Sequence, residues 1–340
     1  MRRVAILRRP PEREEETSGV GAYSDMLEEG LARHGVGCDR IVVNPSVRYG
    51  VWRLVTDGFV RPFLKSLGAG YDAIHATDEF CCLYFPLMKG RKVVTFHHIS
   101  KGMEGKSPFY MLVWRIISKI AVRQAHTIVA VSEQTRDELI TDYGVPPEKI
   151  KVLTHAPPYD FNNLGLERDR VIGCVSSLIE RKNVAGAIRA FWHFTKLPGT
   201  EGYRFVICGN GPLRPQLEGL AKELGIADRV EFVSDLSRDE LERFYNTMAV
   251  YANPSMHEGL GLTPLEAQTC GTPVVSFADA KIPAEVSGGF VKSSDEEGFA
   301  RNMHLLVTNA AFRENVVSDL GRDPDFGDGY LKRLVEIYFE

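Results

Sequence analysis

The chain has 340 residues, of which 44% are hydrophobic and 25% charged, and its formal net charge at pH 7 is −4. This length accommodates two domains of ordinary size, and the composition excludes a disordered or fibrous protein. No apolar run approaches the roughly 20 residues that a membrane-spanning helix requires, which excludes an integral membrane protein of the helical kind.

The cysteines and the N-terminal segment indicate a cytoplasmic protein. The six cysteines have neither Cys-x-x-Cys pairing nor zinc-finger spacing, so we expect reduced, mostly buried thiols. The apolar stretch within residues 1–10 is too short for a signal peptide and reads better as a first strand. The cysteines are Cys38, Cys81, Cys82, Cys174, Cys208 and Cys270.

Short apolar runs alternate with helical patterns through the first half of the chain, as in a mostly parallel sheet covered by helices. Between Arg33 and His126 this half is basic, with 14 Lys and Arg against 6 Asp and Glu. Such a stretch suits an anionic acceptor or membrane surface, and it suits a solvated face equally well. The predicted strands are 4–7, 41–43, 73–75, 93–96 and 127–131, and the predicted helices are 22–33, 51–67 and 108–124.

A second series of alternating elements begins after the Pro-containing connector 156–163. We therefore expect a domain over 1–157, a second over 158–325, and a C-terminal helix within 326–340 that can pack back on the first. Parallel sheets bind ligands beyond the carboxyl ends of their strands, so the cleft between the domains is the expected site. The predicted strands are 171–175, 205–208, 230–233, 250–252 and 274–276, and the predicted helices are 185–195, 213–224, 238–245, 263–270 and 329–338.

A glycine-rich turn between two glutamates, Glu258 and Glu266, carries the clearest chemical signal. Glycines at 259 and 261 permit unusual backbone dihedrals, so the amides at the start of the next helix can face a phosphate. One carboxylate can then bind a sugar and the other a ribose diol. A plain strand–loop–helix corner with a Glu complementing the helix dipole is the simpler interpretation. The amides belong to Gly261, Leu262 and Thr263.

Two cations, Arg181 and Lys182, follow the predicted strand 171–175 and precede a helix. Fixed cations stabilise the charge that develops on a departing diphosphate without a metal ion. They can also be solvated side chains, although cations at a helix N-terminus oppose the helix dipole.

The first half offers Gly19, Gly21 and His97 as candidate site residues. A dinucleotide-binding turn at the two glycines is disfavoured, because position 24 is Ser and the loop lies far from the strand at 4–7. His97 ends a strand, and by strand alternation it and His98 point in opposite directions. His75, also at a strand end, is a weaker candidate.

These motifs occur in the order found in the retaining glycosyltransferases of family 4, which have the GT-B fold, and the chain resembles that family over its whole length. The run EGLGLTPLEAQTCGTPVV at 258–275 resembles the family's E-x7-E region, although Ser176 and Ser177 stand where many relatives have Gly-Arg. The other matching segments are 19–23, 94–97, 129–132, 180–183, 208–212 and 278–285.

The resemblance implies an α/β protein of two Rossmann-like, doubly wound domains that transfers a hexosyl unit from a nucleotide-diphosphate sugar to an acceptor hydroxyl with retained configuration. It implies that Glu258 binds the donor sugar and that Glu266 binds the ribose. It also implies that His97 forms a hydrogen bond with the transferred sugar or the acceptor. By the same resemblance, Arg181 and Lys182 are expected to bind the diphosphate. It adds Gly209 and Gly211 to the donor-binding residues, which are Gly19, Gly21, Arg181, Lys182, Gly209, Gly211, Glu258, Gly261, Leu262, Thr263 and Glu266.

We expect no cofactor and no essential metal, and we interpret Asp323 and Asp325, formally a D-x-D motif, as turn or cap residues. A glycan, a lipid or a small molecule can be the acceptor, and we expect no nucleic-acid partner. The mixed apolar and basic segment 47–67 suits either core packing or contact with the inner membrane surface. A GT-B epimerase or phosphorylase, and a catalytically silent membrane-associated binding subunit, are the alternative functions.

Overall fold

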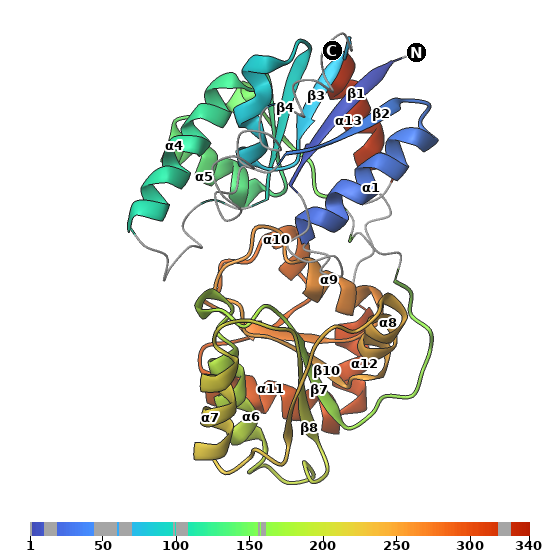
Figure 1. The fold of residues 1–340 in the computed structure, drawn as a ribbon. Coiled ribbons are helices and arrows are strands. Elements are labelled where there is room, and N and C mark those ends of the chain that lie inside the picture. The colour runs from blue at the N-terminus through green and yellow to red at the C-terminus, as the bar shows by residue number, and fades with distance from the viewer. Residues whose placement is uncertain are drawn as a thin grey trace. The chain divides into compact units, whose positions relative to one another are not determined.

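The structure is a computed structural model, and it describes residues 2–9, 19–43, 60, 70–97, 99, 108–155, 157, 161–318 and 328–340. The chain divides into two compact units (Figure 1). Unit 1 comprises Met1–Pro158 together with Pro324–Glu340, and unit 2 comprises Tyr159–Asp323. Of the earlier expectations, segment 47–67 (Val60 apart), His98 and the Asp323–Asp325 motif lie outside the described residues.

Unit 1 contains a six-stranded parallel sheet in the order β2-β1-β3-β4-β5-β6. Its strands are β1 (Arg3–Arg8), β2 (Gly37–Val42), β3 (Ala73–Ala76), β4 (Arg91–Phe96), β5 (Thr127–Ala130) and β6 (Ile150–Val152). Its helices are α1 (Gly19–Arg33), α4 (Pro108–Gln124), α5 (Glu133–Tyr143) and α13 (Asp328–Phe339), with short 3-10 helices η3 (Glu79–Leu87) and η5 (Pro147–Lys149).

Both faces of the inner strands of this sheet are buried, which explains why β1 and β5 read as continuous apolar runs. Successive side chains of β1 alternate between two core clusters. Val4 and Ile6 pack with α1 and α13, whereas Ala5 and Leu7 pack with residues of η3, α4 and α5. A sheet covered by helices on both faces is the doubly wound arrangement expected from the sequence.

Unit 2 repeats this architecture with the sheet order β12-β11-β10-β7-β8-β9, again parallel throughout. Its strands are β7 (Val171–Val175), β8 (Arg204–Cys208), β9 (Val230–Val233), β10 (Val250–Asn253), β11 (Val274–Phe277) and β12 (Val291–Ser293). Its helices are α6 (Val184–Phe194), α7 (Arg214–Glu223), α8 (Arg238–Thr247), α9 (Leu262–Thr269), α10 (Ala284–Ser287), α11 (Glu296–Thr308) and α12 (Ala310–Ser318), with the 3-10 turn η6 (Glu180–Lys182).

The sequence patterns located most strands but missed the helices α5, α10, α11 and α12, of which α11 has 13 residues, and two short strands. β6 and β12 are edge strands of three residues, too short to show a period-two pattern. The helix predicted over 22–33 begins three residues earlier, at Gly19. None of the helices in the described part of the chain combines the length and hydropathy that a membrane span requires.

The C-terminal helix α13 packs on α1 within unit 1 (Figure 1). Its apolar face contributes Tyr330, Leu331 and Leu334 to the core that also holds Val4 and Ile6. A Cβ atom on Gly30 of α1 would lie 2.3 Å from Leu331 Cδ1, so the two helices approach closely only because position 30 has no side chain.

Two glycines hold the turn after β8 against the loop after β7. A Cβ on Gly209 would lie 2.0 Å from the carbonyl oxygen of Ser176, and one on Gly211 would lie 2.4 Å from that of Leu178. Gly209 also has φ +148, a conformation that favours glycine. Backbone hydrogen bonds from Ser176 to Cys208 and from Leu178 to Asn210 join the two loops.

We expect Gly209→Ala to lower the free energy of unfolding by at least about 2 kcal/mol, because the added methyl group would overlap a backbone carbonyl. Urea denaturation of the two proteins measures the change. Gly219→Ala is the matched control, since Gly219 lies in α7 with nothing within 4 Å of its Cβ position. The control should gain roughly 0.5–1 kcal/mol of stability from helix propensity. Equal effects of the two substitutions would contradict the packing role of Gly209.

Candidate functional site

The strand order of unit 2 brings three predicted site residues to one edge of its sheet. β7 and β10 are neighbours, but β7 leads to β8 on one side and β10 leads to β11 on the other. The order of strands thus reverses between them, and ligands of doubly wound sheets bind beyond the carboxyl ends of strands at such a point. Arg181 and Lys182 follow β7, and Glu258 follows β10.

These three side chains form an ion cluster in which Glu258 is buried and the two cations are partly exposed. Lys182 Nζ lies 2.5 Å from Glu258 Oε1, and Arg181 Nη1 lies 3.4 Å from Glu258 Oε2. Arg181 also donates a hydrogen bond to the carbonyl of His257 at 2.7 Å. Burial by itself would raise the pKa of Glu258, but the charges of Lys182 and Arg181 hold that pKa below its ordinary value. Glu258 is therefore ionised at neutral pH.

Backbone hydrogen bonds fix the loops that carry this cluster. The amide of Met256 donates to the carbonyl of Arg181 at 3.2 Å, which joins the loop after β10 to the one after β7. The amides of Lys281 and Glu258 donate to the carbonyls of Met256 and Lys281, which adds the loop after β11. Asn183, with φ 46, ends the η6 turn and caps α6. The charges are thus held by backbone contacts among three loops.

Helix α9 begins at the glycine-rich turn. Gly261 has φ +92, which favours glycine, and it caps the helix without a side chain. The first-turn amides of an α-helix have no partner within the helix, so those of Leu262 and Thr263 suit an anion. The Thr263 hydroxyl lies 2.9 Å from that of Tyr251, which also donates to the carbonyl of Val175 at the end of β7.

Glu266 lies one turn into α9 in surroundings unlike those of Glu258. Its side chain is buried and accepts a hydrogen bond of 2.7 Å from the Tyr245 hydroxyl. Burial raises its pKa to about 7, although the bond from Tyr245 acts in the opposite direction. The two glutamates of the motif are thus one ionised carboxylate held by cations and one carboxyl group that titrates near neutrality.

The structure gives Gly209 and Gly211 a packing function, because each lies against a carbonyl of the loop that precedes the cations. Gly19 and Gly21 occupy the first turn of α1 and not the loop expected before a helix at 22. A place at the start of a helix is compatible with anion binding. Donor binding by these four glycines stays a prediction.

His97 follows β4 in unit 1, and its Nε2 donates to the carbonyl of Thr77, 3.1 Å away, in the loop after β3. The ring of Tyr23 meets His97 edge-on with 4.7 Å between centroids, and it also contacts His155 at 4.8 Å. Tyr23 comes from α1, so the helix that begins with the two glycines also packs against the predicted histidine.

Tyr23 belongs to a buried chain of hydrogen bonds that the sequence did not reveal. Its hydroxyl lies 2.6 Å from that of Tyr330 and 2.9 Å from Thr95 Oγ1, and Thr95 lies 2.8 Å from His75 Nε2. His75 Nδ1 bonds the Tyr338 hydroxyl. Burial lowers the pKa of His75 to about 3, so the ring is neutral and serves structure. This series of hydrogen bonds joins α1, β3 and β4 to both ends of α13.

Arg9, Asp78 and Glu79 were also missed, and they follow β1 and β3, where the strand order of unit 1 reverses. Arg9 forms an ion pair with Asp78, which also caps η3 by accepting from the amide of Cys81. Burial, with the nearby Asp78 charge, raises the pKa of Glu79 to about 8. A search for charges just after predicted strands would have selected these residues.

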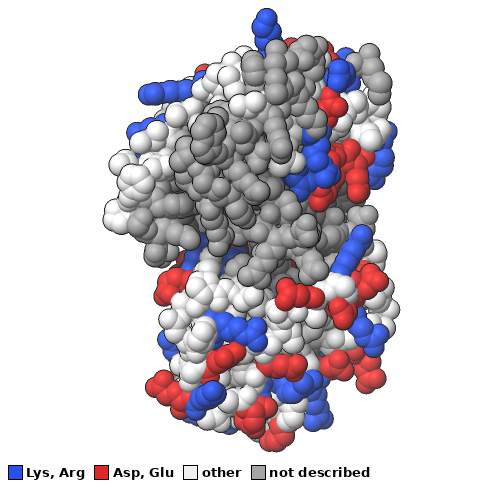
Figure 2. Space-filling model, viewed as in Figure 1, with Lys and Arg blue, Asp and Glu red and all other residues white. Residues whose placement is uncertain are grey.

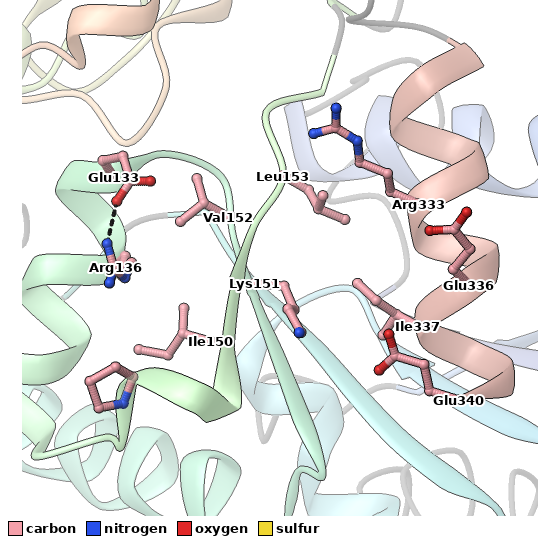
Figure 3. Close-up of a pocket in the computed structure, with 11 residues that line it drawn as sticks. Glu133, Arg136, Ile150, Lys151, Val152, Leu153, Arg333, Glu336, Ile337 and Glu340 are labelled. Atoms are coloured by element: carbon pink, nitrogen blue, oxygen red, sulfur yellow. Dashed lines mark hydrogen bonds and ion pairs between the residues drawn. The ribbon is translucent and has the colours of Figure 1, made fainter.

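A separate cavity of about 440 Å³ in unit 1 holds none of the predicted site residues (Figure 3). It lies over the edge strand β6, between α5 and α13. Charges of both signs line it, and Glu133 and Arg136, both of α5, pair with each other on one side of it at 2.7 Å. We therefore do not assign the predicted chemistry to it. Its polar lining comes from Glu133, Arg136, Lys151, Arg333, Glu336 and Glu340.

Two family models match the chain in succession. The model described as Glycosyltransferase Family 4 matches residues 5–156, and the model described as Glycosyl transferases group 1 matches residues 158–319. An uncharacterized glycosyltransferase of Methanocaldococcus jannaschii is 27% identical over 233 residues, which cover 62% of this chain and 59% of that protein. The D-inositol 3-phosphate glycosyltransferase of Streptomyces bingchenggensis is 30% identical over 244 residues, 64% of this chain and 54% of that protein. The alignments thus span little more than half the length of these relatives.

Solved structures resemble the chain over nearly its full length. WaaG, a glycosyltransferase involved in lipopolysaccharide biosynthesis, has a TM-score of 0.72 at 16% identity and covers 98% of this chain and 99% of its own. HepE of Anabaena, in complex with UDP and glucose, has a TM-score of 0.73 at 15% identity, with 98% of each chain covered. These likenesses confirm the expected GT-B fold class, and the expected cleft between domains stays a prediction.

Glu266→Gln should change how stability depends on pH. The folded-state pKa of Glu266, about 7, lies above the ordinary 4.5, so its stabilising contribution is complete below about pH 4.5 and is lost as the pH rises through 7. Relative to the variant, the parent should lose roughly 3 kcal/mol of unfolding free energy between about pH 4.5 and pH 8. Urea unfolding at several pH values measures the difference. Glu79 is common to both proteins, so its titration cancels, and parallel curves would contradict the raised pKa.

Tyr330→Phe should cost about 1 kcal/mol of unfolding free energy, because it removes one of the two hydrogen-bond partners of the buried Tyr23 hydroxyl and leaves only Thr95. Tyr203→Phe, which removes a hydroxyl from a partly buried residue of unit 2, is the control and should change stability by no more than about 0.5 kcal/mol. If Tyr330→Phe lowers the unfolding free energy no more than the control does, the hydrogen bond between Tyr23 and Tyr330 does not hold α13 in place.

Proposed function

This chain belongs to the group 1 glycosyl transferases of glycosyltransferase family 4, and we propose that it moves a hexosyl unit from a nucleotide-diphosphate sugar to an acceptor hydroxyl with retention of configuration. The observation that carries the proposal is the partly buried cluster of Lys182, Arg181 and Glu258 where the strand order of unit 2 reverses. HepE, whose structures include a complex with UDP-glucose, supports a nucleotide-sugar donor.

The cluster has the capacity to bind a diphosphate while the cations remain paired with Glu258. An ammonium group has three N–H donors and a guanidinium five, so the contacts with one carboxylate leave donors for phosphate oxygens. Two cations and one carboxylate give a net positive cluster in a largely buried place, where each charge acts more strongly than in water. Glu258 also fixes the position of Lys182, so the positive charge is in place before the substrate arrives.

In the proposed reaction the bond between the anomeric carbon and the diphosphate oxygen breaks, and the electron pair leaves with the nucleoside diphosphate. Lys182, Arg181 and the first amides of α9 stabilise that negative charge. The acceptor hydroxyl attacks from the same face and passes its proton to the departing phosphate, so the anomeric configuration is retained. Neither glutamate needs to act as a covalent nucleophile, and no step calls for a metal or cofactor.

Glu266 and His97 have positioning tasks in this scheme. Glu266 accepts from the ribose diol, which its ionised form does best, and Tyr245 supplies one hydrogen bond that favours this form. In unit 1, Thr77 and Tyr23 fix the ring of His97, which bonds the transferred sugar or the acceptor. The acceptor is a glycan, a lipid or a small molecule, at a cytoplasmic location with peripheral contact at the inner membrane surface.

Lys182→Ala should lower kcat by about 100- to 1,000-fold, because it removes a charge that stabilises the leaving diphosphate. An assay that detects the nucleoside diphosphate released from a nucleotide-sugar donor measures kcat. Lys222→Ala, an exposed lysine on α7, is the matched control and should leave kcat unchanged. Circular dichroism and the melting temperature establish that the Lys182 variant is folded. A folded variant with near-normal kcat would contradict the assignment.

The reaction class has its own test. Melting temperatures measured with UDP-, GDP- and ADP-sugars identify the donor, since a ligand that binds only the folded state raises the melting point. NMR of the product then gives the anomeric configuration, and an inverted product would overturn the proposed route. Epimerised or phosphorolysed donor without an acceptor would favour the alternative activities, and donor binding without turnover would favour a silent binding subunit.

A further inference from the structure

The side chain of His155 is buried at the point where the chain leaves unit 1. His155 follows the edge strand β6 by three residues and is 1% exposed, and unit 2 begins four residues later, at Tyr159. Segments that connect compact units make few contacts and are ordinarily exposed. A buried polar ring beside such a connector therefore indicates a role within unit 1 that a plain linker residue would not have.

Three rings from distant parts of the chain surround His155. Its ring centroid lies 4.8 Å from that of Tyr23 in α1, and 5.8 Å from that of His97 after β4. The centroid of Tyr330 in α13 lies 5.9 Å away. Tyr23 and His97 also contact each other, with 4.7 Å between centroids. All these separations are favourable for contacts between rings, so Tyr23, His97 and His155 form a cluster in which each ring contacts the other two.

Hydrogen bonds fix one polar atom of Tyr23 and one of His97. The Tyr23 hydroxyl lies 2.6 Å from that of Tyr330. His97 Nε2 donates to the carbonyl of Thr77 at 3.1 Å. A ring held at one atom can still pivot about that hydrogen bond. The contacts with His155 restrict this rotation for both rings, so the orientation of His97 depends on His155 directly and through Tyr23.

These rings lie apart from the charged surface of the molecule. In the view of Figure 2, Lys, Arg, Asp and Glu side chains lie on the outside of both units, whereas Tyr23, His155 and Tyr330 are no more than 3% exposed. His97 is partly exposed. Of the three rings in mutual contact, only His97 can therefore reach a bound molecule, and His155 acts on that molecule only through its neighbours.

We propose that His155 is a positioning residue for the transfer reaction. Its ring holds Tyr23 and His97 so that the imidazole of His97 meets the transferred sugar or the acceptor in one orientation. The inference rests on the proposed function, which gives His97 that contact. A group that is fixed before the substrate binds contributes most to the rate, and a misplacement of about 1 Å can cost roughly 100-fold.

A buried histidine can also serve only to fill space in the core. Leucine has a similar volume and would replace His155 in that role with little effect on the folded enzyme, but it lacks the flat ring that contacts Tyr23 and His97. The two roles therefore predict different effects of His155→Leu on the rate of transfer.

The first test measures kcat and the donor KM of the full chain, with the donor that the melting temperatures identify. His155→Leu should lower kcat by about 10- to 100-fold. It should change the donor KM by no more than about threefold, because the diphosphate contacts in unit 2 are retained. His155→Phe, which keeps a flat ring, should recover most of the loss. If the leucine variant does not fold, His155→Gln, which has no ring, answers the same question.

Tyr338→Phe is the matched control. It removes a buried hydroxyl that bonds His75, at the end of the same series of hydrogen bonds that lies away from His97. It should lower the melting temperature and leave kcat unchanged. A normal kcat in folded His155→Leu, or an equal loss of kcat in the control, would overturn the proposal.

A double-mutant cycle tests whether His155 acts through His97. When His97 is already replaced by Ala, the further change His155→Leu should alter kcat by less than about twofold. If the two losses simply multiply, His155 acts independently of His97 and is not its positioning residue.

The orientation of His97 can also be measured without turnover. The imidazole signals of His97 in NMR spectra, identified with His97→Gln, should shift in His155→Leu and not in Tyr338→Phe, because the neighbouring Tyr23 ring changes its position relative to His97. Unchanged signals in His155→Leu would overturn the proposal whatever the activity of the parent. Absence of sugar transfer by the parent would instead contradict the proposed function.

Discussion

The pairing of Lys182 and Arg181 with Glu258 is the interaction on which the candidate site depends. Moving the Glu258 carboxylate and much of the two cations out of water has a desolvation cost, and ion pairs repay such a cost only when the partners are held in good geometry. Here the geometry comes from loops after three parallel strands, joined by backbone hydrogen bonds. Gly209 and Gly211 let a fourth loop pack against the same turn. Charged groups held this firmly at the point where the strand order reverses are typical of binding sites, which is why we propose an anionic ligand for this cluster.

The same motif also shows how burial and neighbouring charge separate two identical side chains. Glu258 and Glu266 are both buried, but only Glu258 has cations beside it, so their pKa values move in opposite directions. One stays charged and organises the cations. The other, Glu266, has a pKa near neutral pH and accepts a hydrogen bond from Tyr245, so the contact that we propose with a ribose hydroxyl would be sensitive to small changes in its surroundings.

Unit 1 is held together by a segment that comes from the far end of the chain. Tyr330 and Tyr338 of α13 close a buried row of hydrogen bonds through Tyr23, Thr95 and His75, and the ring of Tyr23 packs on His97. The last helix is therefore linked to the predicted site residue of unit 1 through one tyrosine. The apolar spacing of 329–338 predicted the helix. The tyrosine hydroxyls that bond it to the rest of unit 1 could not be predicted from a sequence pattern, since an isolated Tyr is as common on a surface as in a core.

The amino-acid sequence by itself determined the alternation of strands and helices, the two doubly wound units, and the motifs from Gly19 to Glu266 that identify the family, because periodicity and short motifs are local properties of a chain. The two edge strands β6 and β12, the neutral state of His75 and the cluster at Arg9, Asp78 and Glu79 needed the structure. The different charge states of Glu258 and Glu266 also needed the structure, because the spacing of the motif is compatible with either charge state. Hydrogen-bond partners and pKa values follow from residues far apart in sequence, such as Lys182 and Glu258, and only the packed strand order brings such residues together.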